Sequence, residues 1–425
     1  MFFNGVYLQE NKYTKYLNKY RQHIGLAMIQ GGNALFPLLA FPIIYSSIGA
    51  ERFSQIVFSE SVVMILFSLV IYSFDVTGVR DIKKSVDASS KGKIFFDIFW
   101  FRLFISIFLT AALLLLYFTF NLDLYLLLVL WMLLPIGYAF QSNYFYLANN
   151  DNQVLGTIVV GVRSISLLFI VFFLDGSSEN EVITLCLSSS FLISGLISFL
   201  YCVIFKVDRF LFISRKDVLS MMKDGFPILV SNISVGLFRG SNVIILSVLS
   251  TSGAVSLYSM AEKFIKATQA LMTPLNQLGL ARFSEKYGVS DKTLRALLWS
   301  CTRNQILISS LFVSIIIISL SVVSFWGHSI YQDLWNICLI YILMSPATIF
   351  GILSYMYGMV GMNIIGLKKQ FSYCVLSAGF ISVMLSSLTV IYFAQYSAAA
   401  SYLCGEMILF GMVYFVIRRN EKNER

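Results

Sequence analysis

The sequence predicts an all-α integral membrane protein with twelve transmembrane helices, arranged as two six-helix bundles that enclose a central polar cavity. Its 425 residues are 58% hydrophobic and 12% charged, with a mean hydropathy of +0.78. Soluble domains are roughly 45–50% apolar and about 25% charged. The chain also contains twelve apolar stretches long enough to cross a bilayer, and its basic residues gather in alternate connecting segments.

The order of the elements follows from these stretches, because a spanning helix needs about 17 to 25 mainly apolar residues. By that criterion the spans cover residues 24–44, 56–74, 94–117, 125–147, 154–174, 182–205, 226–250, 257–280, 305–325, 337–360, 371–394 and 398–417. A basic connection after the sixth span divides them into two sets of six. We expect a cytoplasmic basic segment at 1–23, a first bundle at 24–205, a cytoplasmic linker at 206–225, a second bundle at 226–417 and a cytoplasmic tail at 418–425.

The connecting segments carry a strong charge bias. Of the 31 Lys and Arg residues, 25 lie in the termini and in the segments on the same side of the membrane, whereas the opposite loops hold only Arg52. Cytoplasmic segments of membrane proteins are enriched in Lys and Arg. Both termini are therefore predicted to lie in the cytoplasm.

Several function classes are excluded by the chain's composition. The longest loop on the outer side has eleven residues, so no extramembrane domain is expected to hold a catalytic site. The sequence has two histidines, His23 and His328, and six cysteines without metal-binding spacing. The net charge of +9 reflects membrane topology rather than nucleic-acid binding, which needs a basic folded domain. The sequence predicts a transporter with no catalytic residue, metal site or cofactor.

The eighth predicted span carries a polar stripe in the stretch LYSMAEKFIKATQALMTPLNQ. At 100° per residue, Lys266, Gln269, Thr273 and Asn276 fall within about 40° of Glu262. One face of this helix is therefore predicted to line a polar interior. Glu262 and Lys266 also have the i, i+4 spacing of a structural ion pair, and this interpretation is compatible with the first.

Five cations lie inside predicted spans, together with three of the deeper carboxylates. A charged group at the bilayer centre costs about 2.5–3.5 kcal/mol, so these side chains are predicted to be shielded in a common space that is positive overall. Such a space favours an anionic substrate, because Arg and Lys both bind phosphate oxygens. Arg102 is the exception, since it lies near a cytoplasmic end and is predicted to snorkel. The remaining groups are Arg163, Arg239, Lys263 and Lys266, with Glu60, Glu262 and Glu406.

Neutral polar residues occur in spans one and four as well as in span eight. They are Gln30 and Asn33 in MIQGGNALFP, Gln141 and Asn143 in FQSNYFYL, and Gln269 and Asn276 on the polar stripe. Amides beside aromatic rings suit the hydroxyl groups and ring faces of sugars. They also serve as hydrogen-bonding contacts between membrane helices, and both roles stay open.

The two halves of the chain share a weak internal sequence similarity. Ser54 and Glu60 precede Ser256 and Glu262 by 202 residues, and each pair follows a Gly-Ala dipeptide. Transporters are often built from repeated halves, with the binding site where the halves meet. This similarity agrees with the predicted division into two sets of six spans.

These segments resemble a known family of transporters. Residues 255–286, VSLYSMAEKFIKATQALMTPLNQLGLARFSEK, resemble the seventh-to-eighth span region of Wzx-type O-antigen and polysaccharide flippases. Residues 46–61, 363–371 and 398–410 resemble that family's first outer loop, its span-ten exit and its last span. The resemblance covers nearly the whole chain. The sequence departs from the pattern at Ser54 and Ser256, where glycine is usual, and at Phe238-Arg239, where an acidic residue is frequent.

The resemblance implies a V-shaped cavity between two bundles that alternates between cytoplasmic and periplasmic access in the bacterial inner membrane. The implied substrate is an undecaprenyl diphosphate-linked oligosaccharide, the repeat unit of an O-antigen, capsule or exopolysaccharide. Its diphosphate would meet the cations, and its sugars the amides. The implied partners are this substrate, membrane lipids and other polysaccharide-assembly proteins, without nucleic acid. The candidate cations are Arg239, Lys263, Lys266 and Arg163.

Two other functions stay open at this point. A multidrug or metabolite antiporter of the same fold would be expected to use acidic cavity residues, and a membrane polysaccharide polymerase would need a large periplasmic loop. Energy coupling is also open. Glu60, Glu262 or Glu406 could carry a proton or bind sodium, or could be a static partner of a cation.

Overall fold

The computed structural model describes residues 12–120, 122–207, 215–287, 293–326 and 333–423, and within these ranges every regular element is a helix. This confirms the predicted all-α class. The elements are α1 (Lys12–Ile71), α2 (Phe74–Lys84), α3 (Ala88–Phe120), α4 (Asp123–Trp131), α5 (Leu133–Gln141), α6 (Asn143–Asn149), α7 (Asn152–Phe173), α8 (Asn180–Phe205), α9 (Arg215–Leu249), α10 (Ser252–Lys286), α11 (Leu294–Trp326), α12 (Leu334–Met344), α13 (Pro346–Ser354), the π-helix η1 (Tyr355–Met362) and α14 (Lys368–Asn423).

The two longest helices each contain a chain reversal. In α1 the backbone leaves helical geometry at Gly49, whose φ of 79° suits glycine because it has no Cβ. In α14 the break is at Ala394. The hydroxyl of Ser382 donates to the carbonyl of Ser401 at 2.9 Å, so the halves of α14 run antiparallel. Each of these two helices therefore supplies two crossings of the membrane.

The membrane-spanning character of the chain is confirmed, although the number twelve depends on how segments are counted. Among the described residues, eight helical segments are long and apolar enough to span, or nine when the bent α9 is included. The reversals in α1 and α14 add two more. Helix α10 brings the total to twelve. The polar stripe lowers its hydropathy, so it is not among the eight apolar segments.

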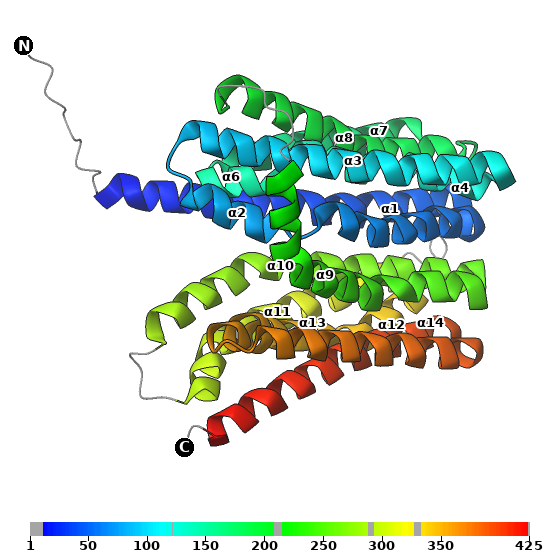
Figure 1. Ribbon diagram of the computed structural model, residues 1–425. Coiled ribbons are helices and arrows are strands. Elements are labelled where there is room, and N and C mark those ends of the chain that lie inside the picture. The colour runs from blue at the N-terminus through cyan, green and yellow to red at the C-terminus, as the bar shows by residue number, and fades with distance from the viewer. Residues whose placement is uncertain (1–11, 121, 208–214, 288–292, 327–332, 424–425) are drawn as a thin grey trace, which may run out of the picture.

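The helices form two bundles that lie one above the other in Figure 1, with α1–α8 in the first and α10–α14 in the second. The described start of α1 and end of α14 lie at the same end of the molecule, which we call the terminal end. The opposite end contains the reversals at Gly49 and Ala394 and is called the turn end. The candidate site is described relative to these two ends.

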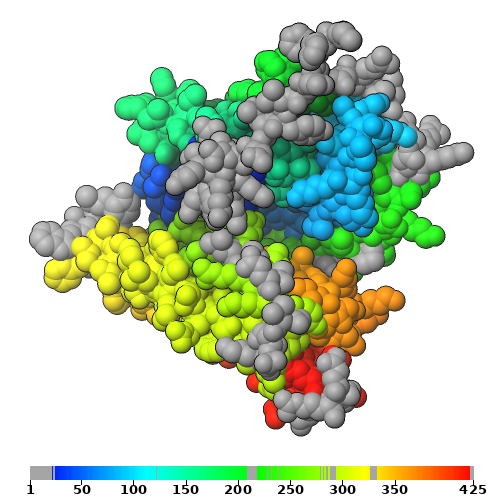
Figure 2. Space-filling view, turned by 90° about the vertical axis from the view of Figure 1, so that its left-hand side faces the viewer, coloured from blue at the N-terminus to red at the C-terminus, as the bar shows by residue number. Residues whose placement is uncertain are grey.

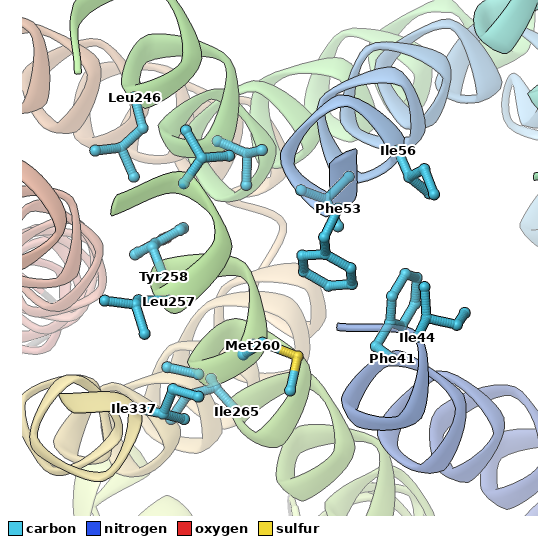
Figure 3. Close-up of a cluster of buried hydrophobic side chains, with 14 of the residues drawn as sticks. Phe41, Ile44, Phe53, Ile56, Leu246, Leu257, Tyr258, Met260, Ile265 and Ile337 are labelled. Atoms are coloured by element: carbon cyan, nitrogen blue, oxygen red, sulfur yellow. The ribbon is translucent and has the colours of Figure 1, made fainter. Parts of the chain in front are cut away.

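Buried apolar side chains join the bundles only in the half of the molecule near the turn end, as far as the described residues extend. One continuous cluster there includes Phe41 and Phe53 of α1 together with Leu257 and Met260 of α10 (Figure 3). Near the terminal end the core divides into two separate clusters. One belongs to the first bundle and the beginning of α9, and the other belongs to the second bundle.

Helix α9 passes from one bundle to the other at the terminal end. The hydroxyl of Tyr72 donates to the carbonyl of Met222 at 2.9 Å, and the amide of Asn232 donates to the carbonyl of Tyr72 at 2.8 Å. Beyond a 41° bend, the second part of α9 packs against α14. The helix begins at Arg215, whereas the sequence placed the linker at 206–225, of which 208–214 lie outside the described residues.

Glycine allows α5 and α8 to approach closely. A Cβ on Gly195 would lie 2.0 Å from the carbonyl oxygen of Gly137, and a Cβ on Gly137 would lie 2.4 Å from the backbone of Phe191. Small residues commonly permit such backbone contact between membrane helices. These two positions therefore fix the spacing within the first bundle.

We expect Gly195→Ala to destabilise the purified protein by about 1–3 kcal/mol, because the added methyl group overpacks a backbone contact. Gly411→Ala is the matched control, since it is also helical and a Cβ there meets nothing within 4 Å. Thermal unfolding in detergent measures both variants. Equal unfolding temperatures for the two would contradict the close approach of α5 and α8.

Candidate functional site

A polar cavity of about 280 Å³ lies inside the second bundle, among α9, α10, α13 and η1. Three side chains of the polar stripe, Gln269, Thr273 and Asn276, line it from α10, as the helical spacing predicts, and Gln277 lies beside them. The other lining residues are Arg239, Ala270, Met272, Thr348, Gly351, Ile352 and Tyr355. The polar face of α10 therefore lines a cavity in the half of the bundle nearer the terminal end.

The guanidinium of Arg239 lines this cavity and is held from behind by Glu406. Its Nε and Nη2 atoms donate to Oε1 of Glu406 at 3.0 and 2.6 Å. The Glu406 side chain is 0% exposed, whereas that of Arg239 is 35% exposed. The second carboxylate oxygen of Glu406 is buried and has no hydrogen-bond partner among the described residues. The pair thus presents its cationic member to the cavity.

Glu262 and Lys266 form the ion pair that their i, i+4 spacing predicts, with a separation of 3.0 Å. The exposed fractions repeat the pattern of the first pair, at 2% for Glu262 and 41% for Lys266. Lys266 lies one turn before Ala270 in the cavity wall. Two neighbouring ion pairs in the second bundle therefore bury their carboxylates and expose their cations.

Amide and phenol groups complete the polar region. The side-chain amide of Gln269 donates to the hydroxyl of Tyr402 at 3.1 Å, which fixes the amide beside the cavity. The Oδ1 atom of Asn276 is buried without a hydrogen-bond partner among the described residues. Asn276 also lines the cavity, so this oxygen is a potential acceptor for a ligand hydroxyl group.

Lys263 lies between the two bundles rather than in the cavity. Its Nζ is 2.6 Å from both carboxylate oxygens of Glu60 in α1, and it also lies 4.3 Å from the centroid of the Phe41 ring. The two side chains are only 9% and 11% exposed. This ion pair is therefore enclosed by the apolar cluster near the turn end.

Two further polar contacts join the bundles at the turn end. The hydroxyl of Ser256 donates to the carbonyl of Ala50 at 2.7 Å, and the hydroxyl of Tyr45 donates to the carboxylate of Asp333. Ser256 stands where the resembling family usually has glycine, so this contact depends on the departure. We refer to these two contacts and the Lys263–Glu60 pair as the turn-end contacts.

Arg163 is buried inside the first bundle, where it is 3% exposed. It donates to the hydroxyl of Ser190 and, at 3.4 Å, to Oδ1 of Asn33. Its guanidinium carbon lies 3.5 Å from the centroid of the Phe191 ring. No carboxylate pairs with it in the described part of the chain, so neutral dipoles and an aromatic ring hold this cation.

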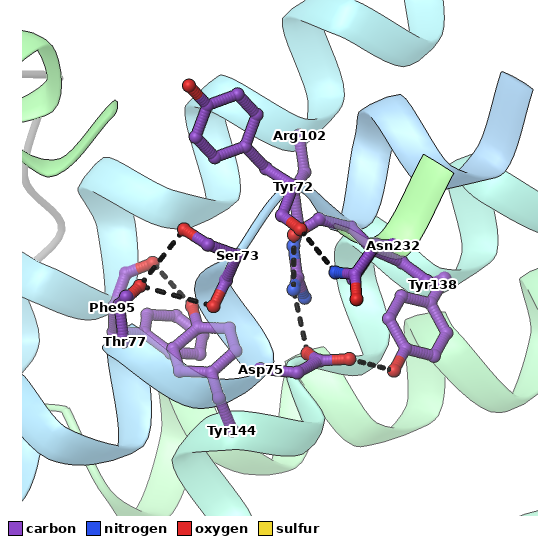
Figure 4. A network of polar contacts seen from close by, with 10 residues as sticks. Tyr72, Ser73, Asp75, Thr77, Phe95, Arg102, Tyr138, Tyr144 and Asn232 are labelled. Carbon is purple, nitrogen blue, oxygen red and sulfur yellow. Dashed lines mark hydrogen bonds and ion pairs between the residues drawn. The ribbon is translucent and has the colours of Figure 1, made fainter. Parts of the chain in front are cut away.

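The prediction that Arg102 snorkels to the membrane surface is wrong. Its side chain is 0% exposed and donates to Asp75 at 2.7 Å, while the hydroxyl of Tyr138 donates to the other oxygen of Asp75 at 2.6 Å (Figure 4). The sequence assigned Asp75 to a loop, but it lies in the first turn of α2. A carboxylate directly after an apolar span was the available signal for this partner.

The remaining predicted residues lie apart from the cavity. Gln141 is buried, and Asn143 has a buried Oδ1 atom without a hydrogen-bond partner among the described residues. Both residues flank Ser142, whose φ of 49° interrupts the helix between α5 and α6. Gln30 is half-buried in α1. His328 and the side chain of His23 lie outside the described residues.

The prediction that Arg163, Arg239, Lys263 and Lys266 share one positive space is therefore corrected. Individual carboxylates shield Arg102, Arg239, Lys263 and Lys266 at separate places, so no common cavity is needed to offset their burial. Only Arg239 of these four lines the polar cavity. The cavity and its neighbourhood offer an anion hydrogen-bond donors on partly exposed cations. They do not offer an excess of positive charge.

Comparison with protein families gives one match over most of the chain. The family model described as "Polysaccharide biosynthesis protein" matches residues 21–280. A protein of Escherichia coli (strain K12) named "Putative O-antigen transporter" is 26% identical over 424 residues, which cover 96% of this chain and 99% of that protein. A protein of the same name from Shigella dysenteriae is 23% identical over 274 residues, which cover 63% and 68% of the two chains.

Solved structures share the fold. A multidrug resistance transporter of the MATE family in the MOP superfamily, in an inward-facing conformation, aligns with a TM-score of 0.71 and 12% identity, covering 92% of this chain and 96% of that one. The lipid II flippase MurJ in an inward closed conformation aligns with a TM-score of 0.63 and 12% identity, covering 95% and 87%. These similarities establish the architecture of the chain.

A double-mutant cycle tests the Arg239–Glu406 pair. Removing one partner of a buried ion pair costs about 3–5 kcal/mol, and since Arg239 is partly exposed we expect up to about 3 kcal/mol for Arg239→Gln or Glu406→Gln. The double variant should regain part of this loss, because neither charge is then left alone. Thermal unfolding of the three variants measures the coupling. Additive losses in the double variant would show that the two side chains do not interact.

Proposed function

The chain belongs to the polysaccharide biosynthesis protein family, and on that premise we propose that it is a flippase for lipid-linked oligosaccharide repeat units. It is a transport protein rather than an enzyme, as its relatives are. We propose an undecaprenyl diphosphate-linked repeat unit of an O-antigen or related polysaccharide as the substrate. It would move from the cytoplasmic to the periplasmic leaflet of the inner membrane.

The observation that carries this proposal is the polar cavity in the second bundle. Arg239 lines it with an exposed guanidinium, and Lys266 exposes its ammonium group one turn away. Both are backed by buried carboxylates, so the site offers charged donors while its net charge stays close to neutral. A diphosphate suits such donors, because Arg and Lys both form charge-assisted hydrogen bonds with phosphate oxygens.

The amides of the cavity wall suit the sugars of the proposed substrate. Gln269, Asn276 and Gln277 provide donors and acceptors for hydroxyl groups, and Tyr355 adds a ring to the same lining. Asn276 has an unpartnered acceptor that a hydroxyl group would satisfy. The lipid tail would stay in the bilayer, because a cavity of about 280 Å³ is too small to hold it.

The basic residues of the connecting segments support a cytoplasmic position for the terminal end. The apolar cores of the two bundles are separate at this end and joined at the turn end. This arrangement fits a state that loads substrate from the cytoplasm. For release into the periplasmic leaflet, the bundles would have to separate at the turn end and meet at the terminal end.

The turn-end contacts would break in that transition. Breaking the Lys263–Glu60 pair leaves two charges that need new partners, since an uncompensated charge at membrane depth is costly. A substrate diphosphate could replace Glu60 as the partner of Lys263. In this proposal Lys263 meets the substrate only after the bundles begin to separate.

The carboxylates remain the candidates for coupling to an ion gradient. Glu406 and Glu262 each have one buried oxygen without a hydrogen-bond partner among the described residues, where a proton or sodium ion could bind. Glu60 would need a proton or another cation when Lys263 leaves. Coupling by either ion is part of the proposal.

We expect Arg239→Ala to abolish complementation in a strain that lacks the chromosomal gene, because the cavity loses the charged donor that lines it. At matched protein levels, surface polysaccharide should fall at least tenfold and lipid-linked repeat units should accumulate inside the cell. Arg239→Lys should restore part of the activity, and Leu388→Ala, at a 65% exposed position on α14, is the surface control. Normal polymer in the deletion strain would contradict the flippase proposal and favour the antiporter.

Cross-linking tests whether the turn end must open. In an active variant without the six native cysteines, Ala50→Cys with Ser256→Cys should give a cross-link that stops transport until a reductant is added. The matched control is Gln55→Cys with Asn180→Cys, whose parent side chains lie 2.8 Å apart within the first bundle. Full transport by the cross-linked Ala50/Ser256 variant would rule out opening at this end.

A further inference from the structure

A second cavity, of about 520 Å³, lies between the two ends of α14. Its lining comes from both halves of the helical hairpin, namely Gln370, Tyr373, Cys374, Phe415, Val416, Arg419 and Asn420. Figure 2 looks onto this end of the molecule, where the start of α14 (orange) and its end (red) are both visible. We call this cavity the hairpin groove. It shares no lining residue with the cavity that contains Arg239.

The lining of the hairpin groove is apolar on the side nearer the bilayer centre and polar toward the helix ends. The rings of Tyr373 and Phe415 are 67% and 64% exposed, and Cys374 is buried in the core of the second bundle. Gln370, Arg419 and Asn420 lie closer to the ends of the two half-helices and contribute polar groups. A ligand that fits this lining has an apolar chain joined to a polar, hydrogen-bond-accepting head.

The charge near the groove is positive. Lys368, Lys369, Arg418 and Arg419 are exposed at the ends of α14. Glu421 is the one carboxylate in the described part of these ends, and Arg295 binds it. The Nε atom of Arg295 lies 2.5 Å from Oε2 of Glu421, and the backbone N–H of Arg295 donates to Oε1 at 2.9 Å. Glu421 is therefore engaged elsewhere and does not neutralise Arg419. The head of the ligand is expected to be an anion.

The depth of the groove matches the boundary of the bilayer. Cys374 lies 20 residues before the reversal at Ala394, and Phe415 lies 21 residues after it. At 1.5 Å per residue each distance is about 30 Å, which is the thickness of the hydrocarbon core. Tyr373 and Phe415 thus lie at the boundary between the acyl chains and the headgroups, and Arg419 lies one turn farther out, at the level of the headgroups. Aromatic residues are typical of this boundary.

We propose that the hairpin groove binds a phospholipid with an anionic headgroup from the leaflet at the terminal end. Its phosphate accepts hydrogen bonds from Arg419, and the first part of an acyl chain packs on Tyr373 and Phe415. The bound lipid fills the space between the two half-helices and so stabilises the hairpin that carries Glu406. The groove follows from the structure alone. The proposed function adds only that the leaflet at the terminal end is the cytoplasmic one.

The experiment compares lipid binding to the purified full chain by native mass spectrometry, with phosphatidylglycerol and phosphatidylcholine as probes. We expect phosphatidylglycerol to bind preferentially. Arg419→Gln should weaken that binding about tenfold or more, since a hydrogen bond to a charged group is worth about that factor. Arg418→Gln is the matched control, because Arg418 is the adjacent exposed arginine and does not line the groove.

A second variant separates a lipid from a free anion. Phe415→Ala should weaken phosphatidylglycerol binding and leave any binding of the soluble headgroup, glycerophosphoglycerol, unchanged, because the ring contacts the acyl chain alone. If the soluble headgroup binds as tightly as the lipid, the site takes a free phosphate ester and the proposal fails.

Three other results would overturn the proposal. Equal binding of the two lipids would remove the role of charge, and equal losses from Arg418→Gln and Arg419→Gln would indicate diffuse attraction outside the groove. Loss of binding of an undecaprenyl diphosphate in Arg419→Gln, with phosphatidylglycerol binding intact, would assign the groove to the substrate. Because the assay measures lipid binding without transport, its failure is distinct from failure of the flippase proposal.

Discussion

The structure depends on one constraint, which is that a charged side chain at membrane depth must have a compensating partner. An uncompensated charge costs about 2.5–3.5 kcal/mol or more at the bilayer centre. Glu406 and Arg239 meet this requirement by joining the second half of α14 to α9, and Lys263 and Glu60 do so by joining the bundles. Each pair fixes one helix against another at a defined depth. The ion pairs therefore specify which faces of these apolar helices meet.

The same constraint stabilises the closed contact between the bundles at the turn end. The Lys263–Glu60 pair lies in a continuous apolar cluster, so partial opening would expose both charges to an environment that cannot solvate them. The pair is stable when closed, and it can separate only if water or new partners reach both groups. At the terminal end, where the cores are separate, no comparable barrier exists among the described contacts. The asymmetry between the two ends is thus a property of where charge is buried.

Much of the fold could be predicted from the sequence, because span length and the distribution of Lys and Arg are local properties. The polar stripe of α10 was equally accessible, since helical spacing alone brings Gln269, Thr273 and Asn276 onto one wall of the cavity. The i, i+4 pair of Glu262 and Lys266 followed from the same rule. These features depend on neighbours within a few turns of one helix.

Partners distant in sequence could not be predicted. Glu406 lies 167 residues from Arg239, and Glu60 lies 203 residues from Lys263, so no spacing rule links them. Asp75 was missed as a partner of Arg102 because it follows an apolar span and was counted with a loop. Without these partners, the sequence suggested a shared positive cavity. The structure replaces that cavity with several local compensations.

The local compensation explains how a site can favour an anion without an excess of positive charge. In both cavity-side pairs the carboxylate is almost fully buried, whereas the cation is 35% or 41% exposed. A ligand in the cavity therefore meets the guanidinium of Arg239 directly and reaches Glu406 only through it. Arg163 lacks such an arrangement, because it is buried among α1, α7 and α8 and held by neutral dipoles. The orientation of the ion pairs, more than the number of cations, determines which face of the second bundle presents charged N–H donors.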